Sequence, residues 1–201
     1  YAVKNGNTIT VRSVNFVGNT ENWYTNPIRT GKTTMVSPFK PYADKDIVLT
    51  TLSIPIIHEG KAIGVVDADI DVSFLQKKLE EISGTKKENF KLLCSGDGII
   101  VANGVDSTKI LKNQFDINPE FKAHVPTIAR NETAEQTALS HTSGLTSKFI
   151  LVPVEVAGVA EKWAFISITA ISVFTADAKK VLMVTVVQYA LILLGVVILL
   201  Y

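Results

Sequence analysis

The sequence predicts an α+β fold of two modules with antiparallel sheets, followed by a transmembrane helix. Three observations support this prediction. Strand-like runs come in pairs joined by short turns, which is typical of hairpins rather than of βαβ units. A helical pattern separates the two sets of strands. The last 21 residues, Val181–Tyr201, contain no charged side chain, and as a helix they would span roughly 31 Å, about the thickness of a bilayer's hydrocarbon core.

The first module is predicted to cover residues 1–72. Thr8–Val14 is rich in β-forming residues and is predicted to be a strand. Gly18–Gly31 is predicted to be a long loop or a short helix. Because the chain starts with Tyr, we expect it to be part of a longer protein.

A hairpin closes this module. Its strands are predicted at Ile47–Ile57 and Ala62–Val72, joined by the four-residue connection His58–Lys61. Pro55 removes a backbone donor, which favours an edge strand or a bulge at that point.

A connecting helix is predicted within residues 73–85. Apolar residues at Phe74, Leu75, Leu79 and Ile82 have helical spacing. Asp71 or Ser73 could cap its start, and Gly84 is expected to end it.

The second module is predicted to cover residues 86–170, and residues 171–201 are predicted to be a stalk and the membrane helix. The module starts with a strand, a Gly-Asp-Gly turn and a strand in the run KLLCSGDGIIVANG. Leu111–Arg130 is expected to be partly helical. Lys148–Val156 and Lys162–Thr169 are predicted strands, and Ser172–Lys180 should be a helix continuous with the membrane span.

Composition excludes several classes of protein. The net charge is +1, which argues against nucleic-acid binding, because such domains cluster Lys and Arg. Cys94 is the only cysteine, so no intrachain disulfide can form, and we expect its thiol to pack as a small apolar group.

No motif indicates catalysis. The three histidines are isolated in sequence, without metal-ligand spacing. The run Gly31–Thr34 imitates the end of a phosphate-binding loop, but Asn26 stands at the required first glycine. Asp67–Asp71 resembles the start of a calcium loop, but that loop's glycine and final Glu are absent. We therefore expect no enzyme, no cofactor and no metal.

Three carboxylates are predicted to share one strand face. In a strand, alternate residues point the same way, which aligns Asp67, Asp69 and Asp71. Such groups repel one another unless water or cations surround them. The face is either an ordinary solvent-facing surface or an acidic floor for a cationic ligand.

Aromatic residues are concentrated upstream of this face. Aromatic rings combined with carboxylates suit an ammonium group, through cation–π attraction and charge-assisted hydrogen bonds. The alternative is that these rings are ordinary core residues, which holds for some of them. The candidate ligand residues are Phe16, Glu21, Trp23, Tyr24, Phe39, Tyr42, Asp44, Asp67 and Asp69.

The order of these residues resembles the double Cache sensor domain of bacterial chemoreceptors. That family shows a Trp-Tyr pair, a Pro-Tyr-x-Asp segment, a strand ending in Pro and an aliphatic residue, and a Gly-Val-Val segment with an Asp. The matching residues here are Trp23-Tyr24, Pro41–Asp44, Ile54–Ile56, Gly60 and Gly64–Ile70. The run GDGIIVAN and the Trp-x-Phe strand also fit, so the resemblance covers nearly the whole chain.

The resemblance implies two PAS-like (Cache) modules on a long N-terminal helix that would precede Tyr1. It places residues 1–178 outside the cytoplasm at the inner or plasma membrane, with the ligand in the N-terminal, membrane-distal module. Lys179 and Lys180 beside the membrane helix favour the opposite orientation, and the resemblance overrides that indication.

The resemblance also suggests the ligand class. The amino-acid-sensing branch has an Arg two residues before the Trp-Tyr pair, and Glu21 stands at that position here. Its ammonium-binding acid corresponds to Asp69, and its early Tyr to Phe16. Asp67 replaces a usual Gly and adds negative charge. The predicted ligand is therefore a small cationic amine, such as a polyamine or a quaternary ammonium.

The predicted function is ligand sensing by a methyl-accepting chemotaxis protein. The expected partners are a small molecule, the membrane, a second copy in a homodimer, and cytoplasmic signalling proteins, without nucleic acid. Three alternatives remain open: an amino-acid sensor, the sensor of a histidine kinase or a cyclic-dinucleotide enzyme, and a structural domain without a ligand.

Overall fold

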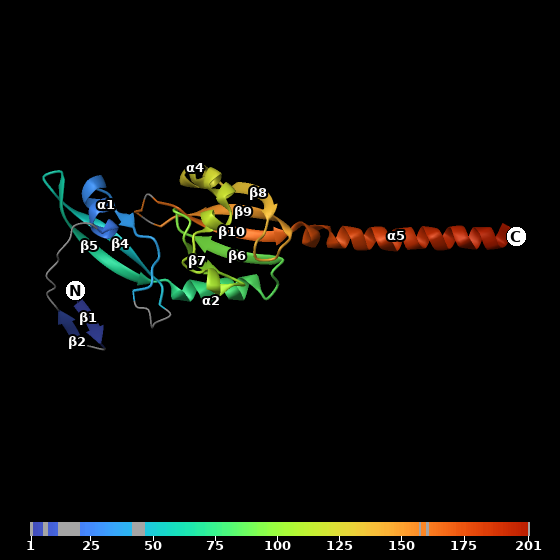
Figure 1. Ribbon diagram of the computed structural model, residues 1–201, viewed down its shortest axis with the longest axis horizontal. Helices are drawn as coiled ribbons and strands as arrows, with labels where there is room; N and C mark the ends of the chain where they lie inside the picture. Colours follow the sequence, from blue (N-terminus) through green and yellow to red (C-terminus); the bar gives the residue numbers. More distant parts are fainter. Residues whose placement is uncertain are drawn as a thin grey trace.

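The computed structural model describes residues 2–5, 8–11, 21–41, 47–156, 158–159 and 161–200. Side chains are described for 21–41, 47–156, 158–159, 161–176 and 179–189. Figure 1 shows two sheet-containing regions along the long axis, with the helix α5 (Ile171–Leu200) extending away from the second. We call residues 21–72 the N-terminal region and residues 86–170 the C-terminal region.

The N-terminal region consists of a helix on a three-stranded sheet. The strands β3 (Thr34–Met35), β4 (Leu49–His58) and β5 (Lys61–Asp71) pair antiparallel in the order β3-β4-β5. The helix α1 (Asn22–Thr30) packs on β4 and β5. Two short strands, β1 (Ala2–Asn5) and β2 (Thr8–Val11), form a separate antiparallel pair.

The turn of the β4–β5 hairpin is tighter than predicted. His58 and Lys61 pair directly, so the predicted four-residue connection is wrong. The turn residues Glu59 and Gly60 have φ of 48° and 77°, as two-residue hairpin turns with the twist of the strands require. The predicted irregularity at Pro55 is confirmed, because the register shifts between Ile56 and Ile57.

The sequence predicted either a loop or a short helix over residues 18–31. The structure has the helix α1 over Asn22–Thr30. Gly31 ends it in the left-handed conformation, with φ of 63°, and donates its N–H to the carbonyl of Pro27 at 2.9 Å. A glycine takes this conformation without a Cβ clash, which makes it a common helix terminator.

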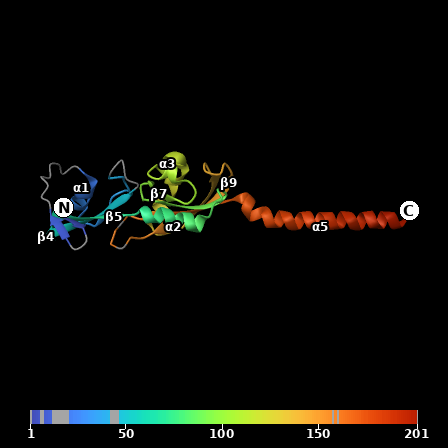
Figure 2. The same cartoon turned by 90° about the horizontal axis from the view of Figure 1, so that it is seen from below.

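The helix α2 (Ser73–Ser83) follows β5 directly, as Figure 2 shows. Its predicted apolar stripe is only partly buried: Leu79 is 5% exposed, whereas Phe74 and Ile82 are 61% and 60% exposed. Gly84 ends the helix as predicted, and its N–H bonds to the carbonyl of Glu80 at 3.1 Å.

The C-terminal region is a five-stranded antiparallel sheet covered on both faces. The strands are β6 (Asn89–Cys94), β7 (Ile100–Asn103), β8 (Ala134–Leu139), β9 (Thr146–Val154) and β10 (Trp163–Ala170), in the order β7-β6-β10-β9-β8. The predicted strands are confirmed, and β8 was not predicted. Four short helices link β7 to β8, as the partly helical prediction required: η1 (Ser107–Lys109), α3 (Gln114–Ile117), η2 (Pro119–His124) and α4 (Val125–Ala129).

The two faces of this sheet build two cores. Phe90, Phe121, Phe149 and Ile166 belong to the core on the side of α4, and Figure 1 shows α4 and α2 on opposite sides of the sheet. Cys94 is buried in that core, as predicted.

The second core joins the two regions of the chain. Leu79 from α2 and Leu93, Val101 and Trp163 from the large sheet pack with Val48 and Val72 at the base of the β4–β5 hairpin. Most of the contact between the two regions is thus apolar. One hydrogen bond also joins them, in which the hydroxyl of Ser37 donates to Oδ2 of Asp97 at 2.5 Å.

The helix α5 starts at Ile171 and runs through the predicted segment Ser172–Lys180 without a break. Within the described part of the chain, no helix has both the length and the apolar character needed to cross a membrane. The predicted span Val181–Tyr201 includes residues outside the described set, and it stays a prediction.

Candidate functional site

The three aspartates of β5 define one face of the small sheet, which we call the carboxylate face. Directly opposed residues of an antiparallel pair share a face, so the pairing partners on β4 extend it. Ser53 lies opposite Asp67, and Thr51 lies opposite Asp69.

The edge of the sheet extends the carboxylate face further. Thr34 on β3 lies opposite Ser53, and Phe39 bridges to Leu49, the residue opposite Asp71. The predicted ligand residue Phe39 therefore lies on the same face as the aspartates, one row from Asp69.

A hydrogen bond fixes the carboxylate of Asp69. The hydroxyl of Thr51, which is 6% exposed, donates to Oδ1 of Asp69 at 2.6 Å. A hydroxyl donor beside a carboxylate restricts the rotation of that side chain. The second oxygen of Asp69 makes no hydrogen bond within the described residues, and the side chain is exposed.

The Asp67 carboxyl has a different environment. Partial desolvation raises the pKa of Asp67, and the negative charge of Asp69 adds to this rise. The hydroxyl of Ser53, on the opposite strand, lowers the pKa of Asp67 in part. The two side chains do not meet hydrogen-bond geometry. A cation beside Asp67 and Asp69 would relieve their mutual repulsion, so the pair favours a positively charged ligand.

Two buried hydroxyls, of Thr34 and Ser53, lie in one cross-strand row with Asp67. The oxygens of Thr34 and Ser53 make no hydrogen bond to any described residue, although the residues are 5% and 0% exposed. Buried polar atoms usually have a partner. The unpartnered pair in the row of Asp67 is therefore an unusual feature of this sheet.

The helix α1 covers the carboxylate face rather than the other face. On the carboxylate face Thr34, Thr51 and Ser53 are at most 6% exposed, whereas Ile54 and Val66 on the opposite face are 46% and 56% exposed. Since α1 packs on β4 and β5, it must cover the buried side.

The Trp23–Tyr24 pair is carried by α1. The two rings meet edge to face, with centroids 5.8 Å apart and an interplanar angle of 79°. Both are partly buried, as is Ile28, and Pro27 is buried. Glu21 precedes the first turn of α1 and is exposed, and its side chain makes no capping hydrogen bond.

The structure thus brings Asp67, Asp69 and Phe39 to one face and sets the helix with Trp23 and Tyr24 over it. Glu21 lies at the start of that helix. Three predicted residues, Phe16, Tyr42 and Asp44, lie outside the described part of the chain.

Sequence reasoning missed the hydroxyl residues Thr34, Thr51 and Ser53. The alternation of Thr51 and Ser53 along β4 was available in the sequence. Their pairing with the aspartates was not, because it depends on the bulge after Pro55. Among the described residues, no three His, Cys, Asp or Glu side chains gather closely enough to hold a metal ion.

Comparisons with known proteins give a family match for part of the chain. Residues 1–77 match the family model described as "Methyl-accepting chemotaxis protein-like, first PDC sensor domain". A search of curated proteins gave no match.

Solved structures with a similar fold are sensor domains. The domain described as the extracellular part of a histidine kinase, mmHK1S-Z3, has a TM-score of 0.65 at 18% identity, over 81% of this chain and 58% of that one. The periplasmic sensory domain of the Campylobacter jejuni chemoreceptor Tlp1 has a TM-score of 0.59 at 18% identity, over 76% and 56%. The ligand-binding domain of the Pseudomonas aeruginosa amino acid chemoreceptor PctB, in complex with L-Gln, has a TM-score of 0.53 at 21% identity, over 86% and 67%.

The chain has the fold of Cache-type sensor domains, and the resemblance drawn from its sequence is confirmed at that level. It spans less than two thirds of the length of the first two structures. The amine-sensing variant, the module boundaries and the ligand residues stay predictions.

Proposed function

Because residues 1–77 match a chemoreceptor sensor model, we propose that this chain is the extracytoplasmic sensor region of a bacterial transmembrane chemoreceptor. That match is the observation that carries the proposal. Residues 1–72 are the membrane-distal, ligand-binding module, 73–85 the connection, and 86–170 the membrane-proximal module. The chain binds a ligand and does not act as an enzyme.

The ligand of this sensor is a small cationic amine. Asp67 and Asp69 supply negative charge, and Thr51 orients one of the two carboxylates. Trp23 and Tyr24 on α1 supply aromatic faces that attract an ammonium group. Glu21 stands where the amino-acid-sensing branch has an Arg, so the carboxylate of an amino acid would meet a negative charge.

Four further residues complete this proposed site. Phe39 lies on the carboxylate face, and this position supports its inclusion in the site. Phe16, Tyr42 and Asp44 rest on the sequence alone.

Ligand binding shifts the population of two states of the distal module. The apolar core shared by Leu79, Val72 and Trp163 and the Ser37–Asp97 hydrogen bond couple that module to the large sheet. The strand β10 leads directly into α5, whose charge-free segment Val181–Tyr201 anchors the homodimer in the inner or plasma membrane. Residues 1–178 lie outside the cytoplasm.

A thermal-shift screen of the purified chain in detergent tests the ligand class. Putrescine, spermidine and choline should raise the melting temperature, because a ligand that binds only the folded state stabilises it. Asp69→Asn should abolish the shift, and Glu59→Gln, at the exposed turn of the same hairpin, should leave it intact.

The outcomes separate the alternatives. Stabilisation by L-Gln but not by amines would contradict the charge argument and support an amino-acid sensor. The absence of any shift across both compound classes would favour a structural domain.

A different cytoplasmic output domain is the second candidate, because one solved structure with this fold is described as part of a histidine kinase. The sequence that follows Tyr201 in the full-length protein distinguishes the two. A long heptad-repeat coiled coil indicates a chemoreceptor, whereas a kinase or cyclic-dinucleotide enzyme domain would replace the proposed output and leave the sensor proposal standing.

A further inference from the structure

The C-terminal region contains a cavity of about 230 Å³ between the large sheet and its short helices. Its floor is the sheet, where Cys94, Leu151 and Ile166 are at most 3% exposed. Phe121 and Ile128, from η2 and α4, cover it and are also buried. Among the described residues predicted to bind the amine, none lines this cavity.

The cavity is open to solvent at one end. Gly96, Val125, Ala129 and Glu161 also line it, and all four are exposed. The lining therefore runs from an exposed rim to a buried apolar floor, as in small-molecule pockets.

The charges around this cavity do not favour an ion. At the rim Lys162 is already paired, with its Nζ 2.5 Å from Oε1 of Glu155. Glu161 makes no ion pair within the described residues. Burial raises the pKa of the Cys94 thiol, so the floor stays neutral. A charged group on the apolar floor would lose its hydration there, and the exposed carboxylate of Glu161 lies at the solvated rim, where pairing contributes little.

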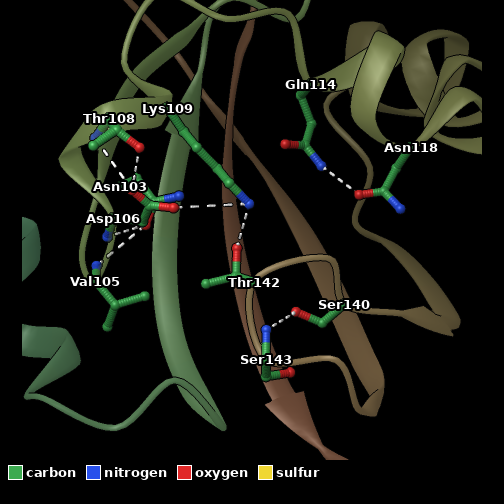
Figure 3. Close-up of polar contacts among 10 residues, drawn as sticks. All are labelled: Asn103, Val105, Asp106, Thr108, Lys109, Gln114, Asn118, Ser140, Thr142 and Ser143. Carbon is green, nitrogen blue, oxygen red and sulfur yellow. Dashed lines mark hydrogen bonds and ion pairs between the residues drawn. The ribbon is translucent and has the colours of Figure 1, made fainter.

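Nearby polar side chains of the same region are occupied by one another. Figure 3 shows Gln114, which also borders the cavity, turned toward Asn118, and its Nε2 donates to Oδ1 of Asn118 at 3.0 Å. Lys109 belongs to a separate cluster, where its Nζ donates to Oγ1 of Thr142 at 2.8 Å.

His124 supplies one hydrogen-bonding position at the cavity. Its Nε2 lies 2.7 Å from Oε1 of Gln136. In the tautomer in which Nε2 donates to this amide oxygen, Nδ1 is left as an acceptor. Within the described residues Nδ1 has no hydrogen-bond partner, and a ligand hydroxyl could donate to it.

We propose that this cavity is a second ligand site, which binds a small uncharged molecule with an apolar ring and a hydroxyl group. An apolar cavity of about 150 Å³ in another protein stays dry and takes up benzene, so the larger space here suits a ring with one substituent. The site is separate from the carboxylate face and does not depend on the amine proposal.

Methyl-resolved NMR of the full chain in detergent micelles, titrated with benzyl alcohol, tests the proposal. The methyl signals of Ile128, Leu151 and Ile166 should shift and saturate. Those of Leu79 and Val101, on the other face of the sheet, should not move, which controls for partitioning into the micelle. Benzylamine and benzoate, which keep the ring and carry charge, should bind at least about tenfold more weakly.

Two variants test the location and the polar contact. Ala164→Leu adds bulk to a lining residue and should abolish the shifts, while Thr137→Leu, on the exposed side of β8, should preserve them. If Ala164→Leu fails to fold, Ile166→Phe serves the same purpose. His124→Phe should lower the affinity for benzyl alcohol about three- to tenfold, the worth of one hydrogen bond, and leave that for toluene unchanged.

Three results would overturn the proposal. The first is no saturable shift at the cavity methyls, and the second is equal shifts in the cavity-filling variants. The third is tighter binding of benzoate or benzylamine than of benzyl alcohol. Loss of amine binding in Asp69→Asn with unchanged benzyl alcohol binding would support two independent sites.

Discussion

Thr51 donates its hydroxyl to Oδ1 of Asp69 at 2.6 Å across the β4–β5 pair. Thr51 is buried and its rotamer is held by the sheet, whereas the Asp69 side chain is exposed. The hydrogen bond therefore orients a carboxylate that would otherwise rotate freely, which is the preorganisation that a cation site requires.

Thr51→Val should weaken amine binding without unfolding the protein. Valine has nearly the same shape and suits a strand, so the main loss is the hydrogen bond to Asp69. We expect the Kd for putrescine to rise about three- to tenfold, the worth of one hydrogen bond, measured by calorimetric titration. Thr50→Val is the matched control, because the Thr50 hydroxyl donates to the carbonyl of Val36 on the opposite face. If both variants weaken binding equally, the Thr51–Asp69 contact has no special role.

Gln76→Met should destabilise the contact between α2 and the large sheet. The Gln76 amide pairs with the backbone of Asn103 in both directions, Nε2 donating at 2.8 Å and Oε1 accepting at 2.8 Å. Methionine leaves these backbone groups unsatisfied, which should lower the free energy of unfolding by about 1–3 kcal/mol. Urea denaturation measures this, and Lys77→Met, exposed on the same helix, should change it by less than about 0.5 kcal/mol. Equal effects of the two variants would contradict the pairing.

Gly104→Ala should also loosen α2, for a steric reason. An added Cβ would lie 2.8 Å from the carbonyl oxygen of Leu79 and still closer to Oγ of Ser83. Such overpacking costs about 1–3 kcal/mol. In a Ser83→Gly background the cost should fall by about 1 kcal/mol, because one clash is removed. Strictly additive effects in this double-mutant cycle would argue against the contact.

Acid should remove the stabilisation that Asp106 provides. Hydrogen bonds from Thr108, with Oγ1 2.6 Å from Oδ1 of Asp106, lower the pKa of the carboxyl, and Lys109 adds to the effect. A folded pKa below the unfolded value of about 3.9 stabilises the protein above that pH. This stability is lost as pH falls through the folded pKa.

Asp106→Asn should therefore be less stable than the parent chain at pH 6, and the difference should shrink toward pH 3 in urea denaturation. Asp116→Asn is the control, since the exposed Asp116 side chain makes no hydrogen bond within the described residues. A difference for Asp106→Asn that stays constant with pH would show that shape, not charge, accounts for its role.

Local sequence patterns predicted most elements of the fold. The helical stripe ending at Gly84 became α2, and the strand pair around the Gly-Asp-Gly turn became β6 and β7. The strand β8 was not predicted because apolar and polar residues alternate only weakly over Ala134–Leu139. Its place at the sheet edge is set by pairing with β9, which lies elsewhere in the sequence. For the segment around Trp23 and Tyr24 the sequence did not distinguish a loop from a helix, since Pro27 and several polar residues favour turns.

The sequence by itself determined that Asp67, Asp69 and Asp71 share a face, because side chains alternate along any strand. Only the tertiary structure decided what faces them. Continuing the register from the His58–Lys61 pair would set Asp69 opposite Thr50, and the bulge after Ile56 moves it opposite Thr51. A one-residue shift in pairing changes every cross-strand partner, so the hydroxyls opposite the acids depend on a packing detail that strand periodicity does not contain.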